Sequence, residues 1–557
     1  MRSTKSPLLA VVNRPRRGAA PLRPISASSI LLPRLCSAPR ANFLREGTTS
    51  VVPSRFQIFL LVAFSLLNPA HLPASKHPTY GGTLRLELQL SKPSLDPRDW
   101  KPGSVTAAEN ARLAVLLYDR LLMVDDFGHF QPALAIDWSH DSPWKSWQFK
   151  LRPGVKFSDG TPLSPKDVVA SLQPLLPPGM QITATETGIN IHSSRAMPDL
   201  LELLASGRYF IFRIQLDGSL LGTGPFVLSE STPPTPAENP SVLKPAHLQF
   251  RANEDSWSGR PFLDSIEVTL GNPGLREILN LQVGRADAIE FSPDLVHKAR
   301  QDNLRVWYSP PTTLIALRFD ESQSAASNPR LREALDLALD RDTMANVLLQ
   351  RQALPAPALL PTWLSGYAFL FGTPVNLDRA KQIRASLPAN VAGAADPLRL
   401  RVDATSDLLK LLGERIAVNA RQANISIQIV SRSTTSTSSA PPAAGLHLLA
   451  WHYDSLSPQS ELLNLSRALH LESVSDALPE AQDPDKLYSE ERRLLEDRQV
   501  LPLLLLPDYV GLAPNVRNWS ASPSGEWRLA DVWLDTAGPQ PSNNSETPQG
   551  RNTGVHP

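Results

Sequence analysis

The alternation of apolar and polar residues predicts several β-strands in this chain. Leucines alternate with polar side chains from Leu84 to Leu90, and residues 147–151 and 398–402 repeat this period of two. Such a period places one side of each strand against a core. Residues 109–122 instead carry apolar side chains at the spacing of a helix, which predicts a helix over that range.

Capping residues mark two helix starts. Ser164 precedes Pro165 and Asp167, so a hydroxyl can cap the helix, a proline occupies its first position, and a carboxylate lies at the positive end of its dipole. Asn328 precedes Pro329 in the same way. Apolar residues follow each start at helical spacing, so we expect a helix to begin at each point.

A strand–helix–strand unit is predicted between residues 398 and 429. The strand 398–402 is followed by a helical pattern over residues 406–422 and by isoleucines at positions 425, 427 and 429. A connection of this kind joins two parallel strands. The chain is therefore predicted to be a mixed α/β protein, with loops in the proline-rich residues 231–245 and the low-complexity residues 431–444.

The first 75 residues differ from the remainder in charge and pattern. They hold ten basic residues and one acidic residue, a formal charge of +9, whereas residues 76–557 carry −8. Residues 1–50 show no sustained period and are predicted to be unstructured. The ten-residue apolar run from Ile58 to Leu67 is typical of the h-region of a secretory signal and is short for a membrane span. A buried helix and an uncleaved membrane anchor are the alternatives.

The composition and the missing motifs argue against several classes of function. The sole cysteine, Cys36, can form neither an intramolecular disulfide nor a cysteine-based metal cluster. A net charge of +1 gives no electrostatic reason to expect nucleic acid as a partner. The chain has no G-x-x-x-x-G-K-[ST] loop, no G-x-S-x-G elbow and no H-E-x-x-H helix. We therefore expect no catalytic residues, no cofactor and no metal site.

Motifs that follow one another over residues 80–535 resemble those of the family 5 extracellular solute-binding proteins. These are the dipeptide-, oligopeptide- and nickel-binding receptors of bacterial ABC importers. The longest match is WQFKLRPGVKFSDGTPLSPKDVVASL at residues 147–172. The other matches are YGGTL at 80–84, SLDP at 94–97, LYDRL at 117–121, GTGPF at 222–226, NEDSWSGRPFLD at 253–264, GRAD at 284–287, RLREALDLALDRD at 330–342 and LPL at 501–503.

The resemblance implies a two-lobed periplasmic-binding-protein-like fold with a hinge and three domains, one of them discontinuous. A ligand would be enclosed between the lobes. The implied organisation is a disordered leader with a secretory signal at 1–75, lobe I at 76–114, 219–310 and 511–535, an inserted domain of lobe I at 115–218, lobe II at 311–510, and a disordered tail at 536–557.

One segment of the resemblance carries candidate ligand-binding residues. Residues 451–458 (WHYDSLSP) resemble the family stretch W-x-x-D-Y-x-D-P. In the peptide receptors of the family, the aspartate three residues after the tryptophan holds the α-ammonium of the ligand, and here that residue is Asp454. A carboxylate in a closed cleft makes a strong charge-assisted hydrogen bond to an ammonium. Trp451, Tyr453 and His452 are further candidates, and a turn-capping role is the alternative for Asp454.

The resemblance also implies the partners and the location of the protein. It predicts a monomeric periplasmic or extracellular receptor that captures peptides and passes them to an ABC permease with its ATPase subunits, with no nucleic-acid partner. A receptor for a metal chelate, haem or another small nutrient is the first alternative. A ligand sensor of the same fold without transport is the second, and a secreted enzyme such as a peptidase is the third.

Overall fold

The computed structural model describes most of residues 77–535. The chain divides into two units, Met1–Ser75 and Lys76–Pro557, and the fold described below belongs to the second. The predicted leader with its apolar run, most of the low-complexity stretch and the tail 536–557 lie outside the described residues. Also outside are residues 91–92, 234, 237–242, 273, 324, 389–390, 394–395, 404, 432–442, 472–473, 475–477 and 479–482.

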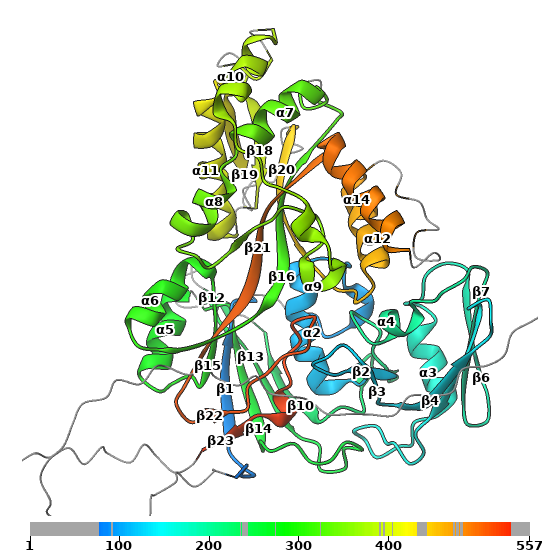
Figure 1. Ribbon diagram of the computed structural model, residues 1–557. Coiled ribbons are helices and arrows are strands. Elements are labelled where there is room, and N and C mark those ends of the chain that lie inside the picture. The colour runs from blue at the N-terminus through cyan, green and yellow to red at the C-terminus, as the bar shows by residue number, and fades with distance from the viewer. Residues whose placement is uncertain are drawn as a thin grey trace, which may run out of the picture. The chain divides into compact units, whose positions relative to one another are not determined.

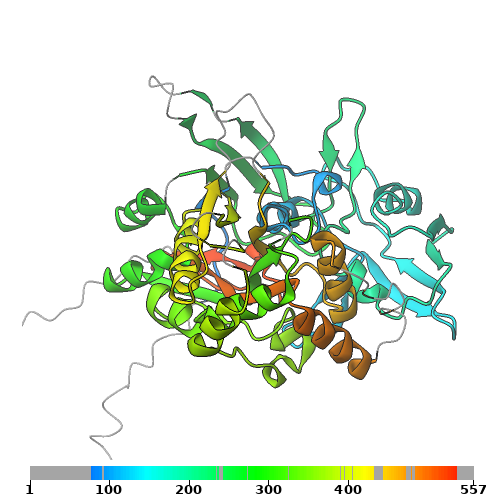
Figure 2. The same ribbon diagram turned by 90° about the horizontal axis from the view of Figure 1, so that it is seen from above.

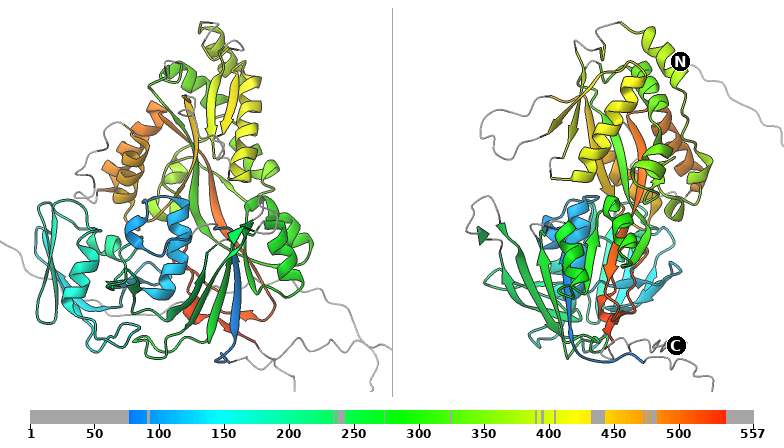
Figure 3. Two further views of the ribbon diagram at one scale, coloured as in Figure 1. Left: turned by 180° about the vertical axis from the view of Figure 1, so that it is seen from behind. Right: turned by 90° about the vertical axis from the view of Figure 1, so that its left-hand side faces the viewer.

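Two long antiparallel strands, β16 (Arg305–Phe319) and β21 (Val500–Leu512), connect the two halves of the second unit (Figure 1 and Figure 3). The large sheet continues on one side of this pair through β15, β1, β14, β13 and β10, and on the other side through β20, β18 and β19. The bounds are β1 Thr83–Leu88, β10 Phe226–Thr232, β13 Ala246–Ala252, β14 Ser265–Leu270, β15 Ala288–Phe291, β18 Leu398–Val402, β19 Ile427–Ser431 and β20 Leu446–His452.

Alternate residues of β16 enter two different cores in the second half. Leu314 and Ala316 pack in a core with helices α12 and α14, whereas Ile315 and Leu317 pack in a core with α7, α10 and α11. Figure 2 shows these two groups of helices on opposite sides of the strands. Because both faces of the strand are covered, its sequence there is a continuous apolar run. The helices are α7 Pro329–Ala338, α10 Leu377–Ala385, α11 Asp407–Gln422, α12 Pro458–Leu469 and α14 Pro484–Asp497.

The first half of the unit contains two further cores. The larger is formed by strands of the large sheet with α2 (Val105–Leu117), α5 (Gly274–Gln282) and α6 (Val296–Gln301). The smaller lies around a separate four-stranded sheet of order β4-β5-β7-β6 and the helices α3 and α4. Their bounds are β4 Ala135–His140, β5 Ser146–Leu151, β6 Met180–Ala184, β7 Gly188–Ser193, α3 Pro165–Leu172 and α4 Leu200–Leu204.

The ladder between β16 and β21 is irregular where two prolines face each other. Pro311 is opposite Pro507, and the register shifts on both sides of Pro311. Because proline has no N–H to donate, the strands share fewer backbone hydrogen bonds at this point. The interruption lies between the residues of the pair that contact β15 and those that contact β20.

Several elements predicted from the sequence are confirmed. β18 and β19 pair with each other in parallel, and α11 connects them along the chain, which is the predicted crossover unit. Helices α3 and α7 begin at Pro165 and Pro329. The predicted loop over residues 231–245 is partly wrong, because β10 extends to Thr232. Two short strands of two residues each, β11 (Thr235–Pro236) and β12 (Leu243–Lys244), then pair antiparallel.

The prediction of a helix over residues 109–122 is wrong at both ends. The helix, α2, covers Val105–Leu117, and the chain is extended from Tyr118 onward. Asp119 is fixed by two distant groups, since the Thr223 hydroxyl and the Trp257 indole N–H each donate to its Oδ2 over 2.7 Å. These contacts connect three of the motifs that carry the family resemblance, and they override the local helical pattern.

The GTGPF motif makes a close backbone approach to the end of α2. The Gly224 N–H donates to the Leu117 carbonyl over 2.9 Å. A Cβ placed on Gly222 would lie 1.8 Å from that carbonyl oxygen. Only glycine permits this approach, so the motif has a structural explanation.

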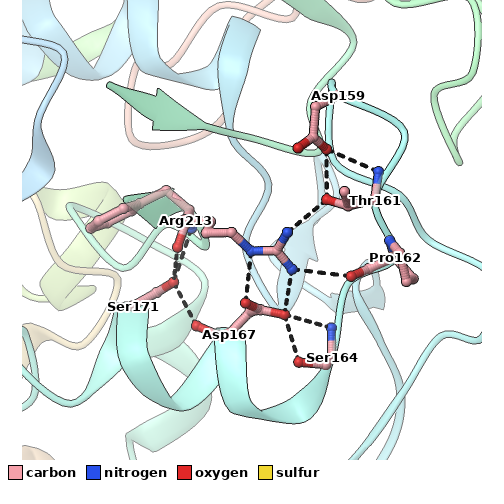
Figure 4. Close-up of polar contacts among 8 residues, drawn as sticks. Asp159, Thr161, Pro162, Ser164, Asp167, Ser171 and Arg213 are labelled. Atoms are coloured by element: carbon pink, nitrogen blue, oxygen red, sulfur yellow. Dashed lines mark hydrogen bonds and ion pairs between the residues drawn. The ribbon is translucent and has the colours of Figure 1, made fainter. Parts of the chain in front are cut away.

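The longest motif is held by an arginine from outside it (Figure 4). Asp167 accepts the Ser164 N–H over 2.9 Å and the Ser164 hydroxyl over 2.6 Å, which closes the start of α3. The Arg213 guanidinium donates to both oxygens of Asp167 over 2.9 Å and to the Thr161 hydroxyl over 2.6 Å. The bidentate pair thereby fastens α3 to the turn before it.

Candidate functional site

A cavity of about 270 Å³ lies between three parts of the chain that are far apart in sequence. Its lining residues fall within 100–111, 175–209 and 454–467, so two of the three parts come from the first half of the unit and one from the second. Most of the lining is apolar. The charged lining residues among those that the structure describes are Lys101, Arg195, Arg208, Arg467 and one carboxylate, Asp454. A concave apolar site with a few polar groups is where a small ligand is expected to bind.

Asp454, the main ligand-binding residue predicted from the sequence, lines this cavity. Its Oδ2 accepts the backbone N–H of Gly103, which belongs to the other half of the unit. Burial raises the pKa of Asp454 to about 7, and the nearby Glu526 carboxylate acts in the same direction. The Gly103 N–H and the guanidinium groups of Arg120 and Arg208 oppose that rise in pKa. Asp454 therefore changes between its carboxylic acid and its carboxylate form near neutral pH.

The other three predicted residues are buried in the protein and bound to protein groups. The Trp451 indole N–H donates to Glu461 Oε1 over 2.6 Å, and the Tyr453 hydroxyl donates to the Leu359 carbonyl over 2.7 Å. The His452 Nδ1 lies 3.0 Å from the Thr312 carbonyl oxygen, and burial lowers the pKa of His452 to about 4. None of the three lines the cavity of about 270 Å³, whereas His452 and Tyr453 line a second cavity of about 20 Å³ that Asp454 also contacts. Their role in ligand binding stays a prediction.

Glu461 is a site residue that the sequence analysis missed. It lies in the first turn of α12 and is 1% exposed. Its Oε1 accepts the Trp451 indole N–H, and its Oε2 accepts the Ser455 N–H over 2.8 Å. Burial raises the pKa of Glu461 to about 8, and the charge of Asp454 adds to this rise. The Glu461 carboxyl group thus binds one residue before and one residue after Asp454. In the sequence, the only sign of this role was an acidic residue soon after Ser457-Pro458.

Arg208 is a second site residue without a sequence signal. Its guanidinium donates to the carbonyl oxygens of Trp100 and Leu175 over 3.3 and 3.5 Å, and it forms no ion pair with any residue that the structure describes. Arg208 and Asp454 line the same cavity from different halves of the unit. The cavity therefore presents a cation and an anion that a zwitterionic ligand can bind together.

A buried ion cluster lies near Asp454, since Arg112 and Glu526 line a small cavity of about 20 Å³ together with Asp454. Arg112 on α2 contacts Glu290 Oε1 at 2.5 Å and Asp508 Oδ2 at 2.7 Å, which joins α2, β15 and β21. The Arg120 guanidinium similarly pairs with Glu526 and donates to the Gly207 carbonyl. Of the backbone groups that line the larger cavity, these charges therefore bind Gly207, through Arg120.

Two further observations concern metals and membranes. Within the described part of the chain, no three histidine, cysteine, aspartate or glutamate side chains come together in an arrangement that could hold a metal ion. Among the helices that the structure describes, none has both the length and the apolar character needed to cross a membrane.

Solved structures show which class of protein has this fold. The structure of the periplasmic binding protein DppA from Helicobacter pylori in complex with the peptide STSA superposes with a TM-score of 0.67 at 17% identity, covering 82% of this chain and 98% of that one. NikA from Staphylococcus aureus in complex with Ni(L-His)₂ superposes with a TM-score of 0.63 at 18% identity, covering 81% and 100%. The fold is therefore the two-lobed mixed α/β fold of the periplasmic binding proteins, as predicted.

The sequence then identifies the family within this class. The profile described as "Bacterial extracellular solute-binding proteins, family 5 Middle" matches residues 129–469, which is more than half of the chain. The chain belongs to this family, as its motifs predicted. The family consists of extracellular binding proteins rather than enzymes.

Curated relatives agree in family and differ in ligand. The nickel-binding protein NikA of S. aureus is 24% identical over 372 residues, which are 63% of this chain and 70% of that protein. The probable di/tripeptide-binding protein 5 of Pseudomonas aeruginosa is 24% identical over 351 residues, which are 54% of this chain and 64% of that protein. The chain thus aligns with about two thirds of the length of these relatives.

Proposed function

We propose that this chain is the extracytoplasmic receptor of an ABC importer, which captures short peptides in the cavity and delivers them to a membrane permease with its ATPase subunits. The receptor acts as a monomer and is exported by the apolar segment from Ile58 to Leu67. Support for this proposal comes from the relative named as a probable di/tripeptide-binding protein and from the structure of DppA, which contains a bound peptide. The observation that carries it is that Asp454 and Arg208, which have opposite charges, line the same cavity.

The two charged groups match the two ends of a peptide. The Asp454 carboxylate receives the α-ammonium, and the Arg208 guanidinium receives the carboxylate, each through a charge-assisted hydrogen bond. Because the two residues belong to different halves of the unit, a zwitterion bound to both favours the closed arrangement. The volume of about 270 Å³ lies near the lower limit of ligand pockets, about 300 Å³. We therefore expect dipeptides and tripeptides rather than long peptides.

The strand pair β16 and β21 contains the proposed hinge between the two lobes. The interruption of the ladder at Pro311 and Pro507 is the proposed hinge, because missing hydrogen bonds make the strand pair easier to bend there. The proposed lobes are lobe I at 76–114, 219–310 and 511–535 with its inserted domain at 115–218, and lobe II at 311–510.

Calorimetry with modified dipeptides tests the proposal directly. The ligands are a free dipeptide, its N-acetylated form without the ammonium, and its C-amidated form without the carboxylate. For the wild-type protein, loss of either charge should weaken binding by about 2–5 kcal/mol, because a buried charged partner is left unpaired.

Two variants serve as matched controls for the two ends. Asp454→Asn should bind the free and the acetylated dipeptides equally, while it still distinguishes the amidated one. Arg208→Gln should show the opposite pattern. Wild-type binding that is insensitive to acetylation would contradict the role of Asp454, and the absence of binding by any dipeptide or tripeptide would contradict the proposed function.

A metal chelate is the second candidate ligand, since one relative is a nickel-binding protein. The cationic lining residues could hold the carboxylates of a chelate, although no metal-ligating cluster is present among the described residues. Nickel supplied together with histidine should give no heat of binding if the receptor is specific for peptides. Saturable binding of that complex, without binding of peptides, would favour the chelate.

A further inference from the structure

Gly103 is the point at which the two halves of the unit meet beside Asp454. It lies just before α2, with a φ of +73°. Its N–H donates to Asp454 Oδ2, and its carbonyl accepts the His452 N–H over 2.8 Å. The backbone of one residue therefore binds two residues of the segment 451–454.

The open face of Gly103 lies against the indole of Trp451. A Cβ built on Gly103 would lie 2.1 Å from Trp451 Cη2 and 2.2 Å from two further ring atoms. The ring has no room to move aside, because Trp451 is 5% exposed and its N–H is bound to Glu461. Contact at this distance is possible only when residue 103 has no side chain.

These interactions connect two separate cores. Ala107 and Ala111, on the helix that follows Gly103, pack in the core of the first half. Trp451 and Tyr453 pack in the core beside α12 and α14 in the second half. The contact of Gly103 with residues 451–454 is thus made between the two halves of the unit and next to the cavity.

We infer that Gly103 is a positioning residue for peptide capture, which orients the Asp454 carboxylate and completes the closed arrangement through its contact with Trp451. This inference rests on the proposed function. The N–H of Gly103 occupies Oδ2, so the second oxygen of Asp454 is left for the ammonium of the ligand. The missing side chain lets the two halves approach until this hydrogen bond can form.

Substitution by alanine tests the contact, with a second glycine as a matched control. Gly103→Ala adds a methyl group that meets the Trp451 ring. Gly154→Ala adds the same methyl group at a φ of +78°, where no atom lies within 4 Å. Both variants carry the strain of a left-handed backbone, so a difference between them reports the contact with Trp451.

The readouts are calorimetric affinity for a free and an N-acetylated dipeptide, and the radius of gyration from X-ray scattering with saturating dipeptide. Gly154→Ala should match the wild type in each. Gly103→Ala should bind the free dipeptide at least tenfold more weakly and should lose most of its preference for the free over the acetylated form. Its radius of gyration should stay larger than that of the wild-type complex. A merely structural role would lower the melting temperature and leave the preference intact.

A second background keeps the test independent of folding defects. In Trp451→Leu protein the added methyl group has room, so Gly103→Ala should weaken binding by less than threefold there. An equal loss in both backgrounds would overturn the inference, as would wild-type affinity and preference in Gly103→Ala. If the wild-type protein binds no peptide, the proposed function fails and this inference fails with it, whereas peptide binding that is unaffected by Gly103→Ala removes this inference alone.

Discussion

The indole N–H of Trp451 donates to Glu461 Oε1 over 2.6 Å at a place where both side chains are buried. Glu461 also accepts the Ser455 N–H through its other oxygen. The segment that carries Asp454 is therefore bound on both sides by one carboxyl group. His452, Tyr453 and Ser455, which flank Asp454 in the sequence, are buried. Contacts within the protein therefore hold the backbone around Asp454.

Glu461→Ala should destabilise the folded protein strongly. The substitution leaves two buried donors unsatisfied, and each costs about 1–3 kcal/mol, so we expect a loss of about 2–6 kcal/mol in the free energy of unfolding. Denaturation in urea measures this loss. Glu254→Ala is the control, because Glu254 pairs with Arg260 at an exposed position and its removal should change stability by less than about 0.5 kcal/mol. Equal stabilities for the two variants would contradict the proposed role of Glu461.

The affinity for peptides should depend on pH in the form of a bell. Burial raises the pKa of Asp454 to about 7, and only the ionised carboxylate binds an ammonium strongly. Affinity should therefore fall by up to about tenfold per pH unit below 7. It should fall again above pH 8, because the α-amino group of a peptide has a pKa of about 7.7–8.0. Calorimetry between pH 5.5 and 9 checks this profile. Asp454→Asn should lose the acidic limb, and a flat wild-type profile below pH 7 would exclude Asp454 as the titrating group.

The stability of the ligand-free protein should decrease as the pH rises from about 4.5 to 8. Burial raises the pKa of Glu461 to about 8 and that of Glu491 to about 7, whereas glutamate in an unfolded chain titrates near 4.3. The two carboxyl groups bind more protons in the folded state in this range, so they make the free energy of unfolding fall with increasing pH. His452, with its pKa lowered to about 4, acts in the opposite direction below about pH 6.5, and the two carboxyl groups outweigh it. Carboxyl groups with a lowered pKa, such as Asp167, lose their contribution only as the pH falls through their own pKa values, below this window.

Melting temperatures measured between pH 5 and 8 check this prediction. Glu491→Gln serves as the matched variant. The Oε1 of Glu491 accepts the Leu359 and Leu360 N–H groups, and its Oε2 accepts the Tyr367 hydroxyl. A glutamine retains one carbonyl oxygen for the two N–H groups and cannot ionise, so the pH dependence should become weaker. A melting temperature that rises from pH 5 to 8 would refute the assignment of raised pKa values.

Much of the secondary structure could be predicted because its causes are local. The period of two at Leu84–Leu88 places these side chains in a core, and the Ser164-Pro165 start fixes the beginning of α3. The end of α2 could not be predicted in this way. Leu117 is followed by an extended chain because Asp119 binds Thr223 and Trp257, which lie more than 100 residues away.

Some residues of the site could likewise be predicted from the sequence, whereas others could be found only in the tertiary structure. The motif around Trp451 was enough to select Asp454, and the structure places that carboxylate in the lining of the cavity. It could not reveal Gly103, which is 351 residues from Asp454, or Arg208, which no motif marks. Nor could it show that Trp451, His452 and Tyr453 are bound to protein groups.

The sequence by itself determined the family, the two-lobed fold class and the segment that carries the main candidate residue. The family, the two-lobed fold and the candidate segment follow from the resemblance of its motifs and their order to those of a known family, and periodicity and capping add the individual helices and strands. All of these signals lie in continuous stretches of the chain. The tertiary structure alone decided which groups surround that residue. The cavity is formed by three segments separated by long stretches of chain, and burial shifts the pKa of a carboxyl group only after those segments have come together.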